Sequence, residues 1–212
     1  MKKVLVLGAG GKIAHWVIEM LRSNHDVQLT LFLRHPGKLK EGAPKNSTVI
    51  QGDVLNGEQL EHTVAGQDIV YANLAGFDID AQAAHIVKAM NAAHVKRLIF
   101  VVSLGIYDEV PGEFGAWNRR QIPQHLPPFR RAADVIEASG LDYTILRPAW
   151  LTNYDEVDYE TTERNEAFKG TEVSRKSVAD LIVKIILSPK LSSRSNLGVN
   201  KPNTDGDKPA FL

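Results

Sequence analysis

The sequence of 212 residues contains no cysteine. This absence excludes a disulfide framework, thiolate zinc sites and a cysteine nucleophile, and we expect no metal site. No apolar run approaches the length that crosses a membrane, and the first residues lack the charged, apolar and small-residue zones of a signal peptide. We therefore expect a cytoplasmic protein that does not bind membranes.

The sequence also lacks an excess of charge, because 25 lysine and arginine residues balance 25 aspartate and glutamate residues. A balanced chain gives no electrostatic reason to expect nucleic acid as a partner. The length suits one sizeable core, and neither an internal repeat nor a second domain boundary is visible. We expect a single α/β domain over residues 1–200 and a polar tail over residues 201–212.

Glycines are concentrated near the start of the chain, between an apolar run typical of a buried strand and a segment with helical spacing. Gly8 permits a tight turn, and Gly10 and Gly11 permit close approach of a pyrophosphate to the free N–H groups of the helix that begins at Lys12 and Ile13. This order predicts a dinucleotide site. The alternative is a tight turn that binds nothing.

Arg34 follows the second predicted strand, about twenty residues after the glycines. In NAD-specific sites an acidic residue near this point binds the ribose hydroxyls, whereas a cation suits a 2′-phosphate. The planar guanidinium can bind a phosphate through two hydrogen bonds, with Lys38 as a second cation. Both residues predict a preference for NADP(H) over NAD(H), unless they are solvated loop charges.

Further candidate residues follow the third, fourth and fifth predicted strands. Asp53, with Val54 after it, either accepts a hydrogen bond from the adenine amino group or caps the next helix. Ala75 and Gly76 either leave room for the cofactor or make a turn. Ser103 follows the fifth strand, where it either faces the nicotinamide or bonds to the local backbone.

Apolar runs and helical periodicities alternate along the chain, as in a parallel sheet with crossover helices. The predicted strands are residues 4–7, 27–33, 47–51, 68–74, 97–102, 143–148, 172–175 and 196–200. The predicted helices are residues 12–21, 58–64, 81–93, 129–139 and 177–187. We expect a long loop over residues 108–128, either a substrate lid or disordered, and no core element over residues 151–170, which would complete the substrate pocket.

Several motifs together resemble one superfamily. They are Gly8–Ala14, Arg34, Gly52–Val54, Val101–Ser103, Ser139–Pro148 and Val173–Ala179. They resemble the atypical short-chain dehydrogenases/reductases, in particular the NAD(P)H-binding, NmrA-like group, and the layout is similar to the flavin reductase/biliverdin reductase B family. The resemblance implies a Rossmann-like doubly wound parallel sheet in three α/β/α layers. It also implies that the backbone near Ala75, Ser103 and Pro148 contacts the cofactor.

The catalytic pair usual in this superfamily, Tyr-x-x-x-Lys, is missing, because no tyrosine is followed four residues later by lysine. Counting back from the Ser-Gly that ends the predicted helix, His125 takes the tyrosine position and Phe129 the lysine position. Ser103, Tyr107 and His125 are the remaining candidates for a catalytic role. The alternative for His125 is a solvated side chain.

We therefore predict an NADP(H)-dependent oxidoreductase that reduces a small-molecule acceptor, such as a flavin, a quinone or a small carbonyl compound. The alternative is a noncatalytic redox sensor that binds the dinucleotide and signals to a protein partner. An isomerase or epimerase is disfavoured, because those reactions ordinarily need the absent base. The sequence indicates neither the acceptor nor the oligomeric state.

Overall fold

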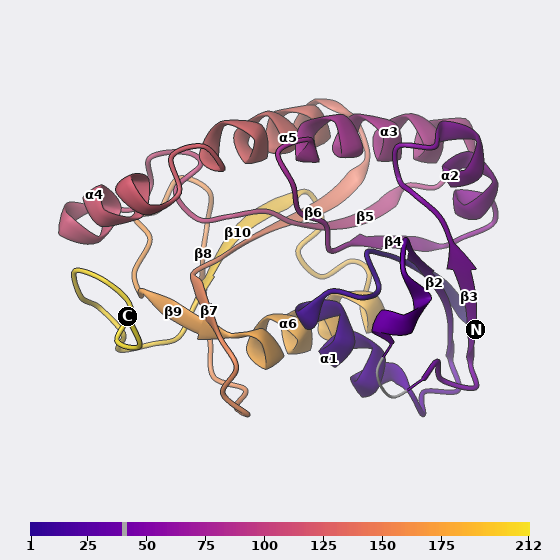
Figure 1. The fold of residues 1–212 in the computed structure, drawn as a ribbon, viewed down its shortest axis with the longest axis horizontal. Coiled ribbons are helices and arrows are strands. Elements are labelled where there is room, and N and C mark those ends of the chain that lie inside the picture. The colour runs from indigo at the N-terminus through magenta and orange to yellow at the C-terminus, as the bar shows by residue number, and fades with distance from the viewer. Residues whose placement is uncertain (40–41) are drawn as a thin grey trace.

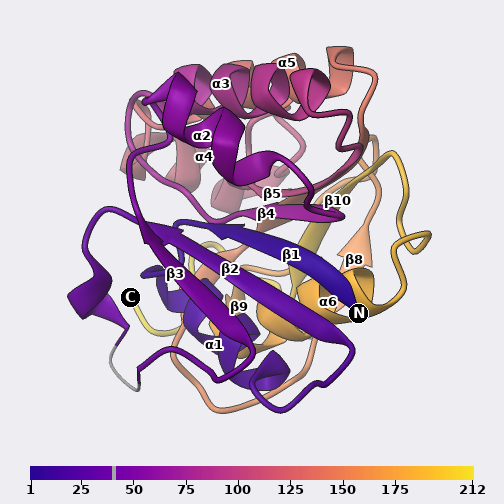
Figure 2. The same ribbon diagram turned by 90° about the vertical axis from the view of Figure 1, so that its right-hand side faces the viewer.

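The computed structural model describes residues 1–39 and 42–212. An eight-stranded sheet in the order β3-β2-β1-β4-β5-β6-β10-β8 forms its middle layer. Neighbouring strands are parallel, except for the antiparallel pair of β10 and β8. Helices cover both faces of the sheet (Figures 1 and 2). The predicted doubly wound α/β/α architecture is confirmed.

The strands in the described part of the chain are β1 Lys2–Leu7, β2 Val27–Leu33, β3 Ser47–Gln51, β4 Ile69–Ala72, β5 Arg97–Val101, β6 Asp142–Pro148, β7 Trp150–Thr152, β8 Glu160–Thr162, β9 Glu172–Ser174 and β10 Ser195–Asn200. The helices are α1 Lys12–Leu21, α2 Gly57–Val64, α3 Ile79–Ala92, α4 Gly112–Gln121, α5 Leu126–Ala138 and α6 Arg175–Leu187, with a short 3₁₀ helix η1 at Pro36–Lys38. The strands β7 and β9 form a separate two-stranded parallel sheet.

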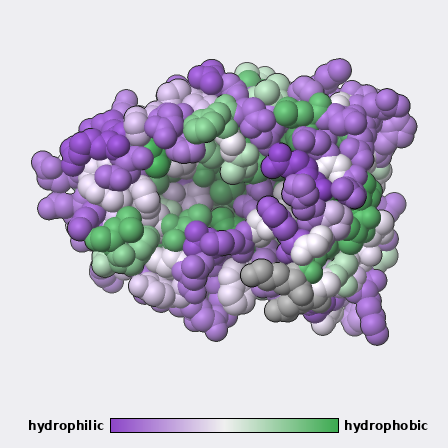
Figure 3. All heavy atoms as spheres, in the orientation of Figure 1, coloured by the Kyte–Doolittle hydropathy of each residue, from purple (hydrophilic) through white to green (hydrophobic). Residues whose placement is uncertain are grey.

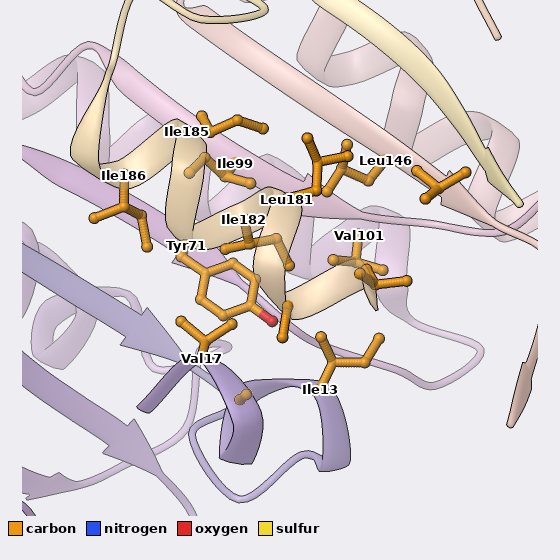
Figure 4. Packing of buried hydrophobic residues seen from close by; sticks show 14 of the residues in the cluster. Ile13, Val17, Tyr71, Ile99, Val101, Leu146, Leu181, Ile182, Ile185 and Ile186 are labelled. Carbon is orange, nitrogen blue, oxygen red and sulfur yellow. The ribbon is translucent and has the colours of Figure 1, made fainter. Parts of the chain in front are cut away.

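The helices α1 and α6 pack together on one face of the sheet. Their apolar side chains surround the ring of Tyr71 from β4, which Figure 4 shows between Val17 and Ile182. Each such aliphatic side chain contributes about 1.5–3 kcal/mol when it is fully buried. The Tyr71 hydroxyl has no hydrogen-bond partner among the described residues, and burial raises its pKa well above the ordinary value. This layer anchors the helix that begins at the glycine turn.

The helices α2, α3 and α5 cover the other face, where α3 packs along α5 (Figure 2). The strands β4 and β5 are buried along their whole length. Strands enclosed on both faces need apolar side chains throughout, which explains their continuous apolar runs. Because the main-sheet strands other than β8 are parallel, their carboxyl ends lie at one edge of the sheet.

The prediction of a long loop over residues 108–128 is wrong, because α4 occupies Gly112–Gln121 and α5 begins at Leu126 rather than at Phe129. Two glycines and three charged residues hide the helical pattern of α4, whose buried residues include Phe114 and the polar Asn118. Prolines in the first turn of α5 cost no hydrogen bond, since the N–H groups there have no partner within the helix.

The expectation that residues 151–170 contain no core element is also wrong. This segment completes β7, contains β8 and places Phe168 in the core with only 3% of its surface exposed. Residues 201–212 form neither helix nor strand, but Thr204 accepts from the backbone N–H of Thr171, and the N–H of Ala210 donates to the carboxylate of Glu172. In the described part of the chain, no helix combines the length and apolarity needed to cross a bilayer.

Candidate functional site

The glycine turn joins β1 to α1 at the carboxyl edge of the sheet. Gly8 has φ +77°, and a Cβ there would overlap the carbonyl oxygen of Asn73. Gly11 caps α1 without a side chain, and a Cβ there would overlap the Asn73 amide nitrogen. The first turn of α1 contains no acidic residue. Free N–H groups at a helix start with no carboxylate beside them suit an anion.

A cleft of about 200 Å³ opens beside this turn, among the carboxyl ends of β1, β2, β3 and β4. Its lining residues are Gly8, Gly10, Gly11, Phe32, Leu33, Arg34, His35, Lys38, Gly52, Asp53, Val54, Asn73, Leu74, Ala75, Asp78 and Gln82. The structure thus brings together eight residues that the sequence singles out for cofactor binding. They are Gly8, Gly10, Gly11, Arg34, Lys38, Asp53, Val54 and Ala75.

One end of the cleft is basic. Arg34 and His35 follow β2, and η1 turns the chain back so that Lys38 lies against Gly10. All three basic side chains are exposed, and neither Arg34 nor Lys38 has an ion-pair partner within the described residues 1–39 and 42–212. Unpaired cations beside a cleft bind a phosphate without first breaking an ion pair.

Asp53 lies at the end of β3, where its carboxylate accepts a hydrogen bond from the backbone N–H of Leu55 at 3.0 Å. The alternative that Asp53 caps the next helix is wrong, because Asn56 caps α2 and accepts from the N–H of Gln59. Gly52 is required beside it, since a Cβ there would lie 2.5 Å from the Phe32 ring.

Sequence reasoning missed the polar residues that follow β4. The Gln82 amide donates to Asp78 at 2.8 Å and to the carbonyl of Ala75 at 3.3 Å. These bonds hold the segment after β4 against α3, while Asn73 fills the space beside the glycine turn. The position of Asn73 directly after a buried strand was a usable signal, whereas nothing local marks Gln82, which lies within a helix.

Five predicted cofactor residues do not line the cleft. Lys12 is exposed in the first turn of α1, and Ile13 is buried beneath the same helix. Gly76 lies in the turn between Ala75 and Asp78 and has φ +129°. Ser103 and Pro148 lie at the ends of the neighbouring strands β5 and β6, and Ser103 donates to the carbonyl of Leu104 at 3.1 Å.

Tyr107 lies away from this cleft, beside a second hollow of about 470 Å³. Its hydroxyl donates to Glu137 at 3.2 Å and accepts from Asn196 at 2.9 Å. Burial, followed by the charge of Glu137, raises its pKa to about 12. The guanidinium of Arg164 lies 4.1 Å from the ring centre. These contacts are typical of a structural residue, and a phenol with a raised pKa is a weak acid.

His125 directly precedes α5, and its ring is stacked on that of Phe77, with centres 4.8 Å apart and planes 17° apart. Phe129, one turn further along α5, packs at the edge of the core. The structure therefore gives His125 an aromatic neighbour, while its proposed role as an acid stays a prediction.

A family model described as NAD(P)H-binding matches residues 8–189. A Rossmann-fold NAD(P)-binding family protein from Shigella flexneri is 55% identical over the full length of both chains, with a TM-score of 0.88. A short-chain dehydrogenase/reductase from Veillonella parvula, solved in complex with NADP, is 31% identical over 99% of each chain, with a TM-score of 0.89. An uncharacterized sugar epimerase from Bacillus subtilis is 26% identical over 85% of this chain and 86% of its own length.

The features of the cleft and the comparisons with known proteins both indicate NAD(P)H binding. The glycine turn, the start of α1 and the exposed cations Arg34 and Lys38 all lie within the matched residues. The chain belongs to the NAD(P)H-binding family, with the Rossmann-type fold of proteins related to the short-chain dehydrogenases/reductases.

Proposed function

We propose that the protein is an oxidoreductase that uses NADP(H), in preference to NAD(H), to reduce a small-molecule acceptor. The observation that carries this proposal is the basic end of the cleft, where Arg34, His35 and Lys38 are exposed after β2. An NAD-specific site would place a carboxylate there to bind the ribose hydroxyls. The Veillonella relative, solved with NADP, supports the same choice.

The lining residues suggest how the cofactor lies. The N–H groups at Gly10 and in the first turn of α1 would bind the pyrophosphate, while the Gly11 N–H closes the turn onto the carbonyl of Gly8. Arg34 and Lys38 would bind the 2′-phosphate, and Asp53 the adenine amino group. When bound, the cofactor supplies the hydride. Its nicotinamide would extend past Ala75 toward Ser103, since ligands of such sheets lie beyond the carboxyl ends of the strands.

Hydride transfer depends chiefly on holding two reactants in contact, so the missing tyrosine and lysine pair does not argue against a reductase. That missing pair does favour a second candidate, a noncatalytic NADP(H) sensor that signals to a protein partner. In this candidate the same cleft binds the cofactor, but no acceptor is reduced. The acceptor of a reductase would be a flavin, a quinone or a small carbonyl compound.

Calorimetric titration with NADPH and NADH tests the cofactor assignment. We expect the wild-type protein to bind NADPH more tightly than NADH, and Arg34→Glu to weaken NADPH binding about tenfold or more, since losing a charged hydrogen bond costs about 1.5–3 kcal/mol. NADH binding should change little. The matched control is Lys88→Glu, a charge reversal on the exposed outer face of α3. Equal binding of the two cofactors by the wild-type protein would contradict the assignment.

Oxidation of NADPH with a flavin, a quinone and a carbonyl compound then separates the two candidates. Turnover with any of them supports the reductase. Tight NADPH binding without turnover, together with a co-purifying protein, supports the sensor.

A further inference from the structure

Phe77 is the most exposed aromatic side chain among the described residues, with 63% of its surface accessible. Exposing a large apolar ring to water is unfavourable, so a flat ligand that covers the ring would gain free energy. Phe77 lies between Ala75 and Asp78, which both line the cofactor cleft. Phe77 therefore belongs to a segment whose neighbouring residues line the cleft, although Phe77 itself does not.

The turn that carries Phe77 is held in place. Gly76 has φ +129°, a conformation that side chains disfavour, and a Cβ there would overlap the carboxylate of Asp78. The Gln82 amide ties Asp78 and Ala75 to α3, and Gln82 is itself only 8% exposed. The conformation of Gly76 and the hydrogen bonds of Gln82 thus fix the turn from which the Phe77 side chain extends into solvent.

His125, whose ring stacks on Phe77, is also held in place, by the start of the helix α5. His125 immediately precedes α5, its N–H donates to the carbonyl of Ile122, and its own carbonyl accepts from Phe129. The stack of His125 on Phe77, with centres 4.8 Å apart, joins the segment after β4 to the start of α5. One face of Phe77 contacts the imidazole, and much of the remaining ring stays accessible.

Figure 3 shows a hollow on the face of the molecule that is viewed in Figure 1, between α4 and α5 above and α6 below, with apolar residues inside it. Trp117 of α4 and Trp150 of β7 form a second aromatic pair, with ring centres 4.7 Å apart. Aromatic surface of this kind favours flat ring systems over small aliphatic molecules, because ring faces stack with an offset.

We propose that Phe77 and His125 form the platform on which a planar, conjugated ring system of the acceptor stacks, with Phe77 as the main contact and His125 as its support. This inference rests on the proposed function and narrows the acceptor to planar conjugated molecules. It assigns His125 a stacking role in place of an acid role. The stack needs an aromatic ring at position 125 and no titratable proton.

Riboflavin is the probe for this platform, because its isoalloxazine ring is planar, and its binding is measured by calorimetry. We expect it to bind the wild-type protein saturated with NADP⁺, and Phe77→Ala to weaken binding about tenfold, the equivalent of about 1.4 kcal/mol. His125→Phe should keep the affinity within a factor of about two, whereas His125→Leu should lower it. Cyclohexanone, which is not planar, should not compete with riboflavin.

The matched control is Phe211→Ala, which removes another exposed phenylalanine next to the C-terminal residue. The NADP⁺ affinity of every variant is measured by calorimetry and should equal that of the wild-type protein. Failure of the wild-type complex to bind riboflavin, or equal affinities of Phe77→Ala and Phe211→Ala, would overturn the platform. A failure of the proposed function is seen separately, as absent NADPH binding or absent NADPH oxidation with every acceptor.

Discussion

The two ends of the sheet are held in different ways. At the cofactor end, β1, β2 and β4 meet at a turn of glycines, where backbone groups pack so closely that a Cβ on Gly8 would overlap a carbonyl oxygen. At the far end, around β6 and β10, buried charged side chains hold the chain, and the side chain of Arg147 is completely buried. The first end leaves N–H groups and exposed cations open to a ligand, whereas at the second end Arg147, Glu109 and Asn196 pair with one another.

The far end depends on one carboxylate. Glu109 accepts from the backbone N–H groups of Gly105 at 3.0 Å and Tyr107 at 2.9 Å, and it forms an ion pair with Arg147. Arg147 also donates to Asn196 of β10 at 2.8 Å. This arrangement fixes residues 105–109, which follow Ser103 along the chain.

Removing Arg147 should produce the largest effect. Arg147→Met leaves the Glu109 carboxylate buried without its counter-ion, and breaking a buried pair in this way costs about 3–5 kcal/mol. Urea unfolding measures the loss. The matched control is Arg119→Met, which breaks the exposed pair of Arg119 and Asp108, separated by 3.8 Å, and should cost about 1 kcal/mol or less. Equal losses in the two variants would contradict the contrast between the two ends.

Gly8→Ala should produce a smaller loss of stability and a larger loss of ligand binding. A side chain at φ +77° is strained and meets Asn73, which costs about 1–3 kcal/mol. The displaced turn should also weaken NADPH binding about tenfold or more by calorimetry, since each 1.4 kcal/mol is a factor of ten. Gly37→Ala is the control, because a Cβ at Gly37 meets no atom within 4 Å. Unchanged NADPH binding in Gly8→Ala would show that the turn does not hold the cofactor.

The same contrast explains what the sequence could predict. The cofactor end is built from neighbours in the chain, so Gly8, Gly11 and Arg34 were recognisable from their spacing after apolar strands. Asn73 was missed because it acts on the glycine turn, which only folding brings near. Gln82 contacts Ala75 and Asp78, which are close in the chain, but nothing in the local sequence distinguishes it within its helix. The doubly wound architecture was predictable because alternating strands and helices leave few topologies, whereas the antiparallel strand β8 was not predicted.

The contacts at the far end could not be predicted from the sequence, because they join residues that are far apart along the chain. The partners of Glu109 and Tyr107 include Arg147 and Asn196, which are 38 and 89 residues away along the chain. The helix α4 buries Asn118, which accepts from the indole N–H of Trp150 at 2.9 Å, so its inner face does not look apolar in the sequence. Polar side chains that pair across distant segments have no periodic pattern.

Tyr107→Phe should give the smallest effect and tests how completely the far end satisfies its polar groups. At about pH 8 the loss of the hydroxyl should cost about 1 kcal/mol. The pKa of Tyr107 is raised to about 12 in the folded protein by burial and by Glu137, against about 10 in the unfolded chain. A raised pKa means that the folded state holds the proton more tightly, so this stabilisation is complete below about pH 10 and is lost as the pH rises toward about 12.

The advantage of the wild-type protein over Tyr107→Phe should therefore shrink between about pH 10 and about pH 12, as measured by urea unfolding at a series of pH values. Comparing the two proteins at each pH cancels the other groups that titrate in this range. A difference that stays constant with pH would mean that the phenol is solvated in the folded protein. The polar network at the far end would then be open to water, and the contrast with the cofactor end would be smaller than the hydrogen bonds of Tyr107 indicate.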